Sequence, residues 1–238
     1  MFVPKLNLIF IHVPKTGGSS IKRAINSNLP TTNYGMRNHS IYRHYEEYCN
    51  RNHRSIRAYT IVSCVRCPYS MLWSKYNHMC IKQQKWWTDG ERSQYLYLNP
   101  DTGEYVATYD KFCALVNDYH AEYITIRAKD RSRQCATMLN NIVTDSRIRT
   151  YKELFIPQKY FLCDSSGNLH VDELLHTETL SLEWPRVAQK YGFASMVVKN
   201  KGSHRSSTYA SNIDMHVTIR DKIYEIFLED FRMFGYSK

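Results

Sequence analysis

The sequence lacks any long apolar run and any signal-peptide pattern. The eight-residue run from Leu6 is too short to span a bilayer, and the chain does not open with a charged segment followed by a long apolar one. The seven cysteines are odd in number and irregularly spaced, and Cys64 and Cys67 form a lone C-x-x-C without the second pair that structural zinc needs. These absences predict a soluble, cytoplasmic protein of a reducing compartment, without a membrane span or a bound metal.

Internal repeats and blocks of like charge are also absent. A chain of 238 residues with 43% hydrophobic content is long enough for one good core, so a single domain over residues 1–238 is expected. Lys and Arg number 32 against 22 Asp and Glu, a formal charge of +10. This balance favours an anionic partner such as a nucleotide, an acidic glycan, a nucleic acid or a membrane surface. The basic residues are scattered, so charge alone does not choose among these partners.

The nucleoside-triphosphate motif G-x-x-x-x-G-K-[ST] is missing too. Residues 12–20, HVPKTGGSS, look like a phosphate-binding loop, yet Lys15 precedes the glycines and no lysine follows Gly18. An apolar, β-branched run precedes this loop and a helical pattern follows it, so the order is strand, tight turn, helix. The two glycines permit positive φ angles and a close approach of the backbone, which lets N–H groups at the helix start converge on an anion. The residues predicted to complete the cradle are Lys15, Thr16, Gly17, Gly18, Ser19 and Ser20.

Strand-like and helix-like segments alternate along the rest of the chain. Residues 57–66, a segment near 160–164 and another near 174–180 read as strands; helical patterns occupy 40–52, a stretch from Pro68, 109–118, 131–142, 181–191 and 214–233. This alternation predicts an α/β fold of three layers, in which helices flank a central, mostly parallel sheet and ligands bind at the carboxyl ends of the strands. The turn-rich, aromatic stretch 83–108 is expected to form an insertion or lid.

A second group of candidate phosphate ligands follows the second long strand. Arg66 leaves the strand, and Ser74 lies about two turns into the next helix, on the face it shares with Ser70. Arg66 offers a fixed fork of donors, and Ser74 adds a hydroxyl without charge. Together they are candidates for a clamp on a second phosphate.

These motifs resemble those of a known enzyme family. IFIHVPKTGGSS is similar to the 5′-phosphosulfate loop, and VRCPYSMLWSKY to the 3′-phosphate motif, of sulfotransferases that use 3′-phosphoadenosine-5′-phosphosulfate (PAPS). PQKYFLCDSSGNLHVDELLHTETL resembles the segment leading to the family's E-x-L strand, and NKGSHRSSTYASN with the later DFRMFGY resembles its C-terminal part. The likeness is to the carbohydrate-type group, which includes heparan sulfate sulfotransferases and short bacterial and viral proteins. It implies a P-loop-like fold, PAPS as the donor and a hydroxyl-bearing acceptor, with no nucleic acid as partner.

The chain departs from the family pattern at two positions. Cys67 stands where the family usually has an aspartate after the motif arginine, and Met71 stands where a second arginine is common. The loss of the acid removes a capping carboxylate from the helix start, and the 3′-phosphate clamp is expected to be looser if that acid orients Arg66. Arg66, Pro68 and Ser74 keep their places.

The resemblance also implies roles in sulfuryl transfer. A cation at the bridging oxygen of the phosphosulfate would stabilise charge that develops there, and Lys15 is the candidate. The acceptor hydroxyl needs a base; His39, just ahead of a helix, resembles the histidine of the carbohydrate group, while a packing role stays open for it and more so for His44 and His12.

Two alternatives from other functional classes of protein remain. One is a P-loop-type nucleotide kinase or ATPase, disfavoured by the missing motif, and the other is a non-enzymatic basic module that binds glycans or nucleic acid. The hydroxyl acceptor is expected to be a carbohydrate. Four aromatic residues of the 83–108 stretch are candidates for stacking on sugar rings, with lid packing as the alternative: Trp86, Trp87, Tyr95 and Tyr97.

Overall fold

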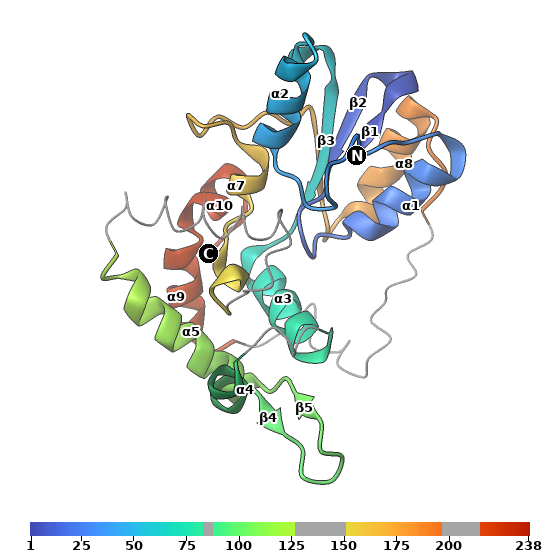
Figure 1. Cartoon of the computed structure of the whole chain (residues 1–238). Helices are drawn as coiled ribbons and strands as arrows, with labels where there is room; N and C mark the ends of the chain where they lie inside the picture. Colours follow the sequence, from blue (N-terminus) through green and yellow to red (C-terminus); the bar gives the residue numbers. More distant parts are fainter. Residues whose placement is uncertain (83–87, 127–150, 197–214) are drawn as a thin grey trace. The chain divides into compact units, whose positions relative to one another are not determined.

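The computed structural model describes residues 1–82, 88–126, 151–196 and 215–238 (Figure 1). The chain forms two compact units, each assembled from two separate stretches. Met1–Cys67 and Gln158–Ser207 make the first unit, and Pro68–Pro157 and Thr208–Lys238 make the second. The helix expected over 131–142 lies outside the described residues. No helix in the described ranges is both long enough and apolar enough to cross a bilayer.

The first unit is built on a four-stranded sheet in the order β1-β2-β3-β6. The long strand β3 (Thr60–Val65) lies between β2 (Leu8–Ile11) and β6 (Glu173–His176) and runs parallel to both, whereas the short edge strand β1 (Phe2–Val3) is antiparallel to β2. All residues of β2 and all but the first of β3 are buried. This is the near-continuous apolar pattern of strands that are covered on both faces.

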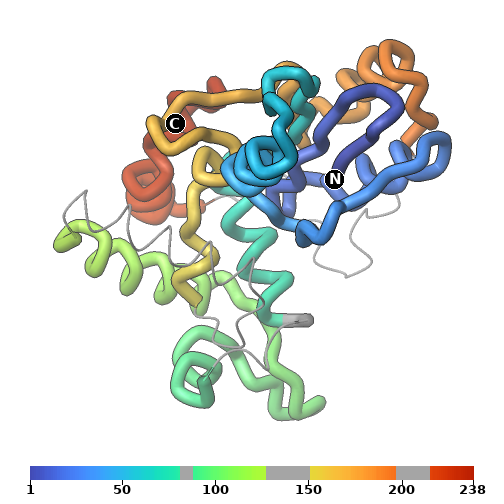
Figure 2. The backbone as a smooth tube through the Cα atoms, turned by 45° about the horizontal axis from the view of Figure 1, so that its top comes forward, coloured from blue at the N-terminus to red at the C-terminus, as the bar shows by residue number. Residues whose placement is uncertain are grey.

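Helices cover both faces of this sheet (Figure 1). α1 (Gly18–Asn28) and α8 (Leu180–Tyr191) share one core with alternate residues of the strands, such as Phe10 and Val62. Figure 2 shows α8, in orange, running beside α1, in blue, although about 150 residues separate them in sequence. On the other face, Phe2 packs edge-on against Tyr45 of α2 (Tyr42–Arg51), with ring centroids 5.4 Å apart. The predicted three-layer α/β fold with a mostly parallel sheet is confirmed.

Short 3₁₀ turns complete the first unit. They are η1 (Pro4–Leu6), before β2, and η2 (Ile56–Ala58), before β3. One strand prediction in this unit is wrong: residues near 160–164 form the short helix α7 (Lys159–Leu162). Its apolar pair Phe161 and Leu162 is buried, and a run this short satisfies a strand or a helix equally well.

The second unit is mainly helical. It contains α3 (Pro68–Lys82), α5 (Tyr109–Tyr123), η4 (Tyr151–Phe155), α9 (Val217–Ile226) and α10 (Leu228–Met233). The predicted C-terminal helix over 214–233 is thus two helices joined at Phe227. Aromatic packing holds the unit together: Trp73 of α3 meets Phe112 of α5 edge-on at 5.0 Å, and Tyr119 stacks on Phe155 at 3.8 Å.

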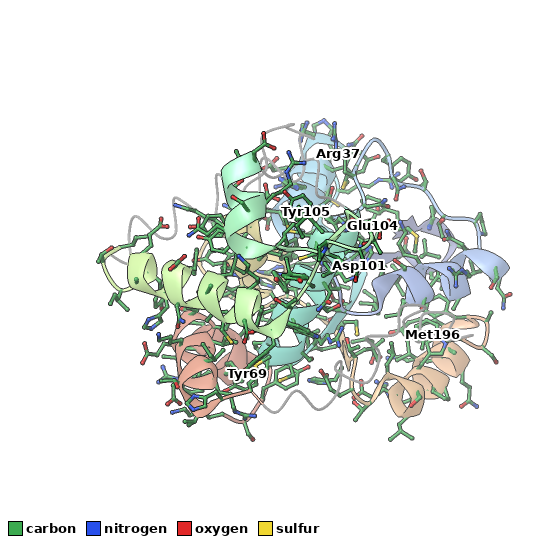
Figure 3. All side chains as sticks on the ribbon, turned by 90° about the horizontal axis from the view of Figure 1, so that it is seen from below. Arg37, Tyr69, Asp101, Glu104, Tyr105 and Met196 are labelled. Atoms are coloured by element: carbon green, nitrogen blue, oxygen red, sulfur yellow. The ribbon has the colours of Figure 1, made fainter. Side chains whose placement is uncertain are left out.

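The stretch expected as an insertion or lid has defined structure where it is described. α4 (Asp89–Tyr95) begins with a capping box between Thr88 and Glu91, and β4 (Tyr97–Leu98) pairs with β5 (Tyr105–Val106) in a hairpin. Figure 3 marks Asp101, Glu104 and Tyr105 along this hairpin. Tyr95 is buried and donates its hydroxyl to Asp118, so it packs inside the unit; Tyr97 is 46% exposed. Trp86 and Trp87 lie outside the described residues.

Candidate active site

Three parallel strands of the first unit end at one edge of the sheet, and polar residues follow each of them. Residues 12–17 follow β2, Arg66 follows β3, and Thr177 and Glu178 follow β6. Ile11 pairs with Ser63 and Val65 pairs with His176, so the strand ends lie close together. In open α/β sheets this edge is where ligands bind.

The loop after β2 bends through two left-handed residues. Gly17 has φ 79°, a conformation that costs glycine little, and Lys15 has φ 66°, which is uncommon for a residue with a side chain. Such a conformation costs about 1–3 kcal/mol and persists where the surroundings impose it, typically at functional sites. Left-handed residues turn successive N–H groups toward a common point, and α1 begins directly afterwards at Gly18. The loop therefore has the backbone geometry that is typical of an anion-binding turn at a helix N-terminus.

Gly18 is required for a different reason than the sequence suggested. It is helical rather than left-handed, and a Cβ at this position would lie 2.0 Å from Cδ2 of His12. The His12 ring thus packs directly beneath the start of α1. Burial lowers the pKa of His12 well below its usual value, and the nearby cationic side chains Lys22 and Lys15 add to the effect, as does His39. A neutral imidazole therefore supports the loop from behind, as expected for His12.

The hydroxyl groups of the loop have different surroundings. Thr16 is fully buried and donates its hydroxyl to the carbonyl of Val13 at 2.9 Å, so this side chain closes the turn. Ser20 is also buried, whereas Ser19 is exposed at the first turn of α1. Ser19 is consequently the best placed of the three hydroxyls to reach a ligand, and Thr16 offers its backbone N–H.

Arg66 contacts the phosphate-type loop directly. Its guanidinium Nη1 donates a hydrogen bond to the carbonyl oxygen of Lys15 at 3.3 Å. The two motifs, 51 residues apart in sequence, are therefore joined within the first unit. Ser74 is half-buried on α3, which belongs to the second unit. Its role beside Arg66 stays a prediction.

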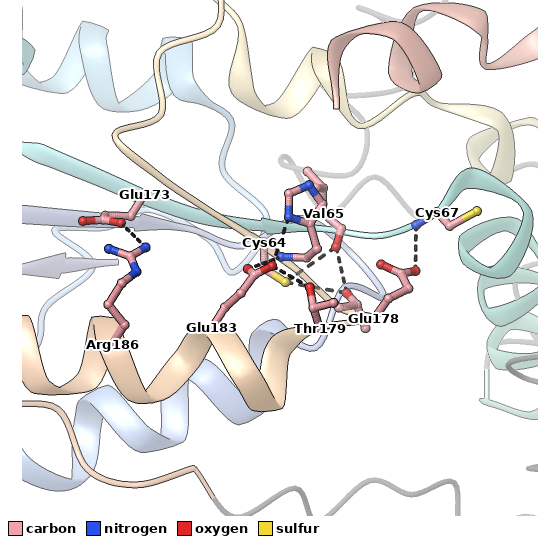
Figure 4. A network of polar contacts seen from close by, with 10 residues as sticks. Cys64, Val65, Cys67, Glu173, Glu178, Thr179, Glu183 and Arg186 are labelled. Carbon is pink, nitrogen blue, oxygen red and sulfur yellow. Dashed lines mark hydrogen bonds and ion pairs between the residues drawn. The ribbon is translucent and has the colours of Figure 1, made fainter. Parts of the chain in front are cut away.

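Sequence reasoning missed two side chains that hold the turn after β3. Gln158 is fully buried; its Oε1 accepts from the backbone N–H of Arg66 at 2.9 Å, and its Nε2 donates to the Arg66 carbonyl at 2.8 Å. Glu178 accepts the backbone N–H of Cys67 at 2.9 Å, as Figure 4 shows. Both residues lie in the segment that resembles the approach to the E-x-L strand, which was the available signal.

Glu178 places a carboxylate where the sequence seemed to lack one. The motif arginine is followed by Cys67 rather than an acid, but the Glu178 carboxylate reaches the N–H immediately before α3 from the end of β6. The chain at this end of β6 is fixed in turn, because both the N–H and the hydroxyl of Thr177 donate to the Val65 carbonyl, at 2.8 and 2.9 Å. The Glu178 carboxylate therefore binds the backbone of the residue that stands where the family usually has the acid.

The two cysteines of the C-x-x-C pair are both free thiols, and their surroundings differ. Cys64 is buried, lies 3.6 Å from the hydroxyl of Thr177, and burial raises the pKa of its thiol to about 12. Cys67 is half-buried. Within the described ranges, no group of three or more His, Cys, Asp or Glu side chains is arranged to hold a metal ion.

His39 lies against the loop with its ring oriented by the backbone. Its Nδ1 lies 3.0 Å from the carbonyl oxygen of His12, and the two rings are 4.6 Å apart. A carbonyl only accepts, so Nδ1 carries the proton and the lone pair of a neutral ring is on Nε2. This tautomer gives His39 the form that a general base needs.

The segment before His39 is tied to α1 as well. Lys22 of α1 donates to Oδ1 of Asn38 at 2.6 Å. His44 has a local role instead: its Nδ1 accepts the backbone N–H of Ile41 at 3.3 Å and so caps α2, and burial lowers its pKa. The structure thus brings His39, not His44, to the phosphate-type loop.

The comparisons with known proteins concern the family of the chain. No individual curated protein matches the chain. The profile of the sulfotransferase family matches residues 1–237, which includes both motifs and both units. The chain belongs to the sulfotransferase family.

Proposed function

We propose that this protein transfers a sulfuryl group from PAPS to a hydroxyl group of a carbohydrate acceptor. The observation that carries the proposal is the hydrogen bond between Arg66 and the Lys15 carbonyl, because it joins the two motifs that resemble the 5′-phosphosulfate and 3′-phosphate sites. The order Lys15 before the glycines argues against a triphosphate loop. Both units are proposed to form one sulfotransferase domain, since the family profile runs through both.

The residues at the strand ends fit a doubly phosphorylated nucleotide. The left-handed turn and the start of α1 present N–H groups to the 5′ side, together with Lys15 and the exposed Ser19. Arg66, with Ser74, is assigned to the 3′-phosphate because a guanidinium fork matches phosphate geometry. The bound donor supplies the sulfuryl group and a bisphosphate leaving group. The positive charge of Lys22, whose pKa burial lowers, adds to the favourable field for this anion.

Two residues are assigned to the chemical step. The ammonium group of Lys15 stabilises negative charge on the bridging oxygen as that charge develops, which is an interaction stronger in the transition state than before it. Nε2 of His39 takes the proton of the acceptor hydroxyl, and Nδ1 stays bonded to the His12 carbonyl so that the ring keeps its orientation. These roles need no metal ion.

The assignment of a carbohydrate acceptor rests on the resemblance to the carbohydrate-type group and on the formal charge of +10, which favours binding of an acidic glycan. A labelled-donor assay tests the proposal: PAPS carrying radioactive sulfur is incubated with desulfated glycans and with simple phenols. Label transferred to a glycan supports the full proposal. Transfer to phenols alone would support PAPS as the donor and contradict the carbohydrate acceptor. The absence of both PAPS binding and transfer would contradict the assignment of PAPS as the donor.

A further inference from the structure

Gln158 makes two amide hydrogen bonds to the backbone of one residue, Arg66. Oε1 accepts the Arg66 N–H at 2.9 Å and Nε2 donates to the Arg66 carbonyl at 2.8 Å, and the side chain is fully buried. The two residues are 92 positions apart in sequence and belong to the same unit. The amide of Gln158 therefore takes the place of a neighbouring strand for one residue beyond the end of β3.

Arg66 needs such a partner because the sheet ladder stops one residue earlier. β3 ends at Val65, whose carbonyl receives the N–H and the hydroxyl of Thr177 from beyond β6. The next N–H and carbonyl, those of Arg66, lie one residue beyond this ladder and are partly buried, where polar backbone groups favour a hydrogen-bond partner. Gln158 bonds both at once and so restrains the backbone of Arg66.

A fixed backbone matters here because the Arg66 side chain is long and carries the phosphate-facing group. The guanidinium is already directed to the Lys15 carbonyl, 3.3 Å away. A displacement of its Cα moves the whole fork, and phosphate recognition by two parallel N–H groups depends on that geometry. Glu178 holds the following N–H, that of Cys67, so both residues of the turn are held by distant side chains.

We propose that Gln158 is a positioning residue that orients Arg66 and thereby sets the preference for nucleotides that carry a 3′-phosphate. Gln158 does not touch the nucleotide; it acts through the backbone of Arg66. The proposal rests on the proposed function, because it takes the ligand of Arg66 to be the 3′-phosphate of the donor. It concerns recognition of that phosphate and is independent of the acceptor and of His39.

The test compares two ligands that differ only in the 3′-phosphate, adenosine 3′,5′-bisphosphate and adenosine 5′-monophosphate. Their dissociation constants are measured by calorimetry with the full chain, its Gln158→Met variant and its Gln158→Glu variant. Methionine matches the length of glutamine and makes neither hydrogen bond; glutamate keeps the acceptor for the Arg66 N–H but loses the donor. Gln189→Met, at an exposed position of α8 in the same unit, is the matched control.

Gln158→Met should weaken bisphosphate binding on the order of tenfold and change monophosphate binding less than about twofold, as expected for loss of coupling between contacting groups. The bisphosphate affinity of Gln158→Glu should lie between that of the wild type and that of Gln158→Met. Adding Gln158→Met to Arg66→Ala should cause little further loss of bisphosphate affinity, since the two act through one guanidinium. Gln189→Met should bind both ligands like the wild type.

Equal weakening for both ligands, or a double variant whose losses add fully, would overturn the proposal and make Gln158 a merely structural residue. A melting curve shows whether Gln158→Met folds. If it does not, the same two comparisons, between the two ligands and between single and double variants, are made with Gln158→Glu. A wild type that binds the bisphosphate no better than the monophosphate contradicts the proposed donor itself. That result is distinguishable, because it appears before any variant is made.

Discussion

The guanidinium of Arg66 donates a hydrogen bond to the backbone carbonyl of Lys15, 3.3 Å away. This contact links the residue that follows β3 to the left-handed turn that follows β2. It places the guanidinium group beside the turn that contains Lys15 and Gly17. The proposed donor carries phosphate groups at both the 5′ and the 3′ position of its ribose, so this contact between the two motifs is the observation on which the proposal rests.

Arg66→Ala should weaken adenosine 3′,5′-bisphosphate binding by roughly 2–4 kcal/mol, because a charge-assisted contact to a partly desolvated phosphate is lost. ATP, which has no 3′-phosphate, should be affected little. Calorimetric titration of both nucleotides measures the difference, and Arg23→Ala, exposed on α1, is the control for removing a positive charge nearby. Equal losses for ATP and the bisphosphate would mean that Arg66 serves the structure or a different phosphate.

Lys15→Ala should lower kcat more than it weakens bisphosphate binding, because the ammonium acts mainly on charge that forms during transfer. Alanine, like lysine, has a Cβ that makes a φ of 66° unfavourable, so the backbone strain is the same in both proteins and only the ammonium group is lost. Lys5→Ala, at an exposed position, serves as the control. Single-turnover rates and bisphosphate dissociation constants are compared. If affinity falls as far as the rate does, the lysine contributes uniform binding and its catalytic assignment fails.

His39→Ala should reduce acceptor sulfation by about 10²- to 10⁴-fold, the usual effect of losing a positioned general base, and leave bisphosphate affinity nearly unchanged. The rate of the intact protein should fall at acid pH, because a protonated imidazole has no lone pair on Nε2 to accept a proton, and this acid limb should vanish in the variant. The measurement is a pH–rate profile of both proteins, with the exposed His53→Ala as control.

A His39→Ala protein that keeps its rate and its pH profile would show that His39 is not the general base. If only its melting temperature falls, His39 is a packing residue. In either case the donor site is unaffected, because it depends on Lys15, Arg66 and the turn between β2 and α1.

Gly18→Ala should destabilise the fold by about 1–3 kcal/mol and weaken bisphosphate binding, because its Cβ would lie 2.0 Å from Cδ2 of the half-buried His12 ring. His12→Ala in the same chain should recover much of the lost stability by removing the clashing ring. Thermal melts of the single and double variants measure this, with Gly90→Ala, where a Cβ meets no atom within 4 Å, as the control. A single Gly18→Ala variant as stable as the wild type would show that the ring does not constrain the loop.

The sequence patterns predicted the layers, the parallel sheet and the two motifs because each depends on local spacing or on strand order. The contacts of Gln158 and Glu178 were beyond this reasoning, since they join backbone and side chains 92 and 111 residues apart and leave no local pattern. The left-handed Lys15 was also missed, because glycine is the residue that normally signals a positive φ. Residues near 160–164 were misassigned because a short apolar run has no distinguishing period.

The measurement that tests the central claim most directly is a thermal-shift comparison of the full chain with adenosine 3′,5′-bisphosphate, ATP with magnesium, and an oligonucleotide. A ligand that binds only the folded state raises the melting temperature in proportion to its concentration relative to Kd. At equal concentrations, the bisphosphate should raise the melting temperature most and the other two should change it little. A larger shift with ATP and magnesium, or with the oligonucleotide, would contradict the proposed PAPS site.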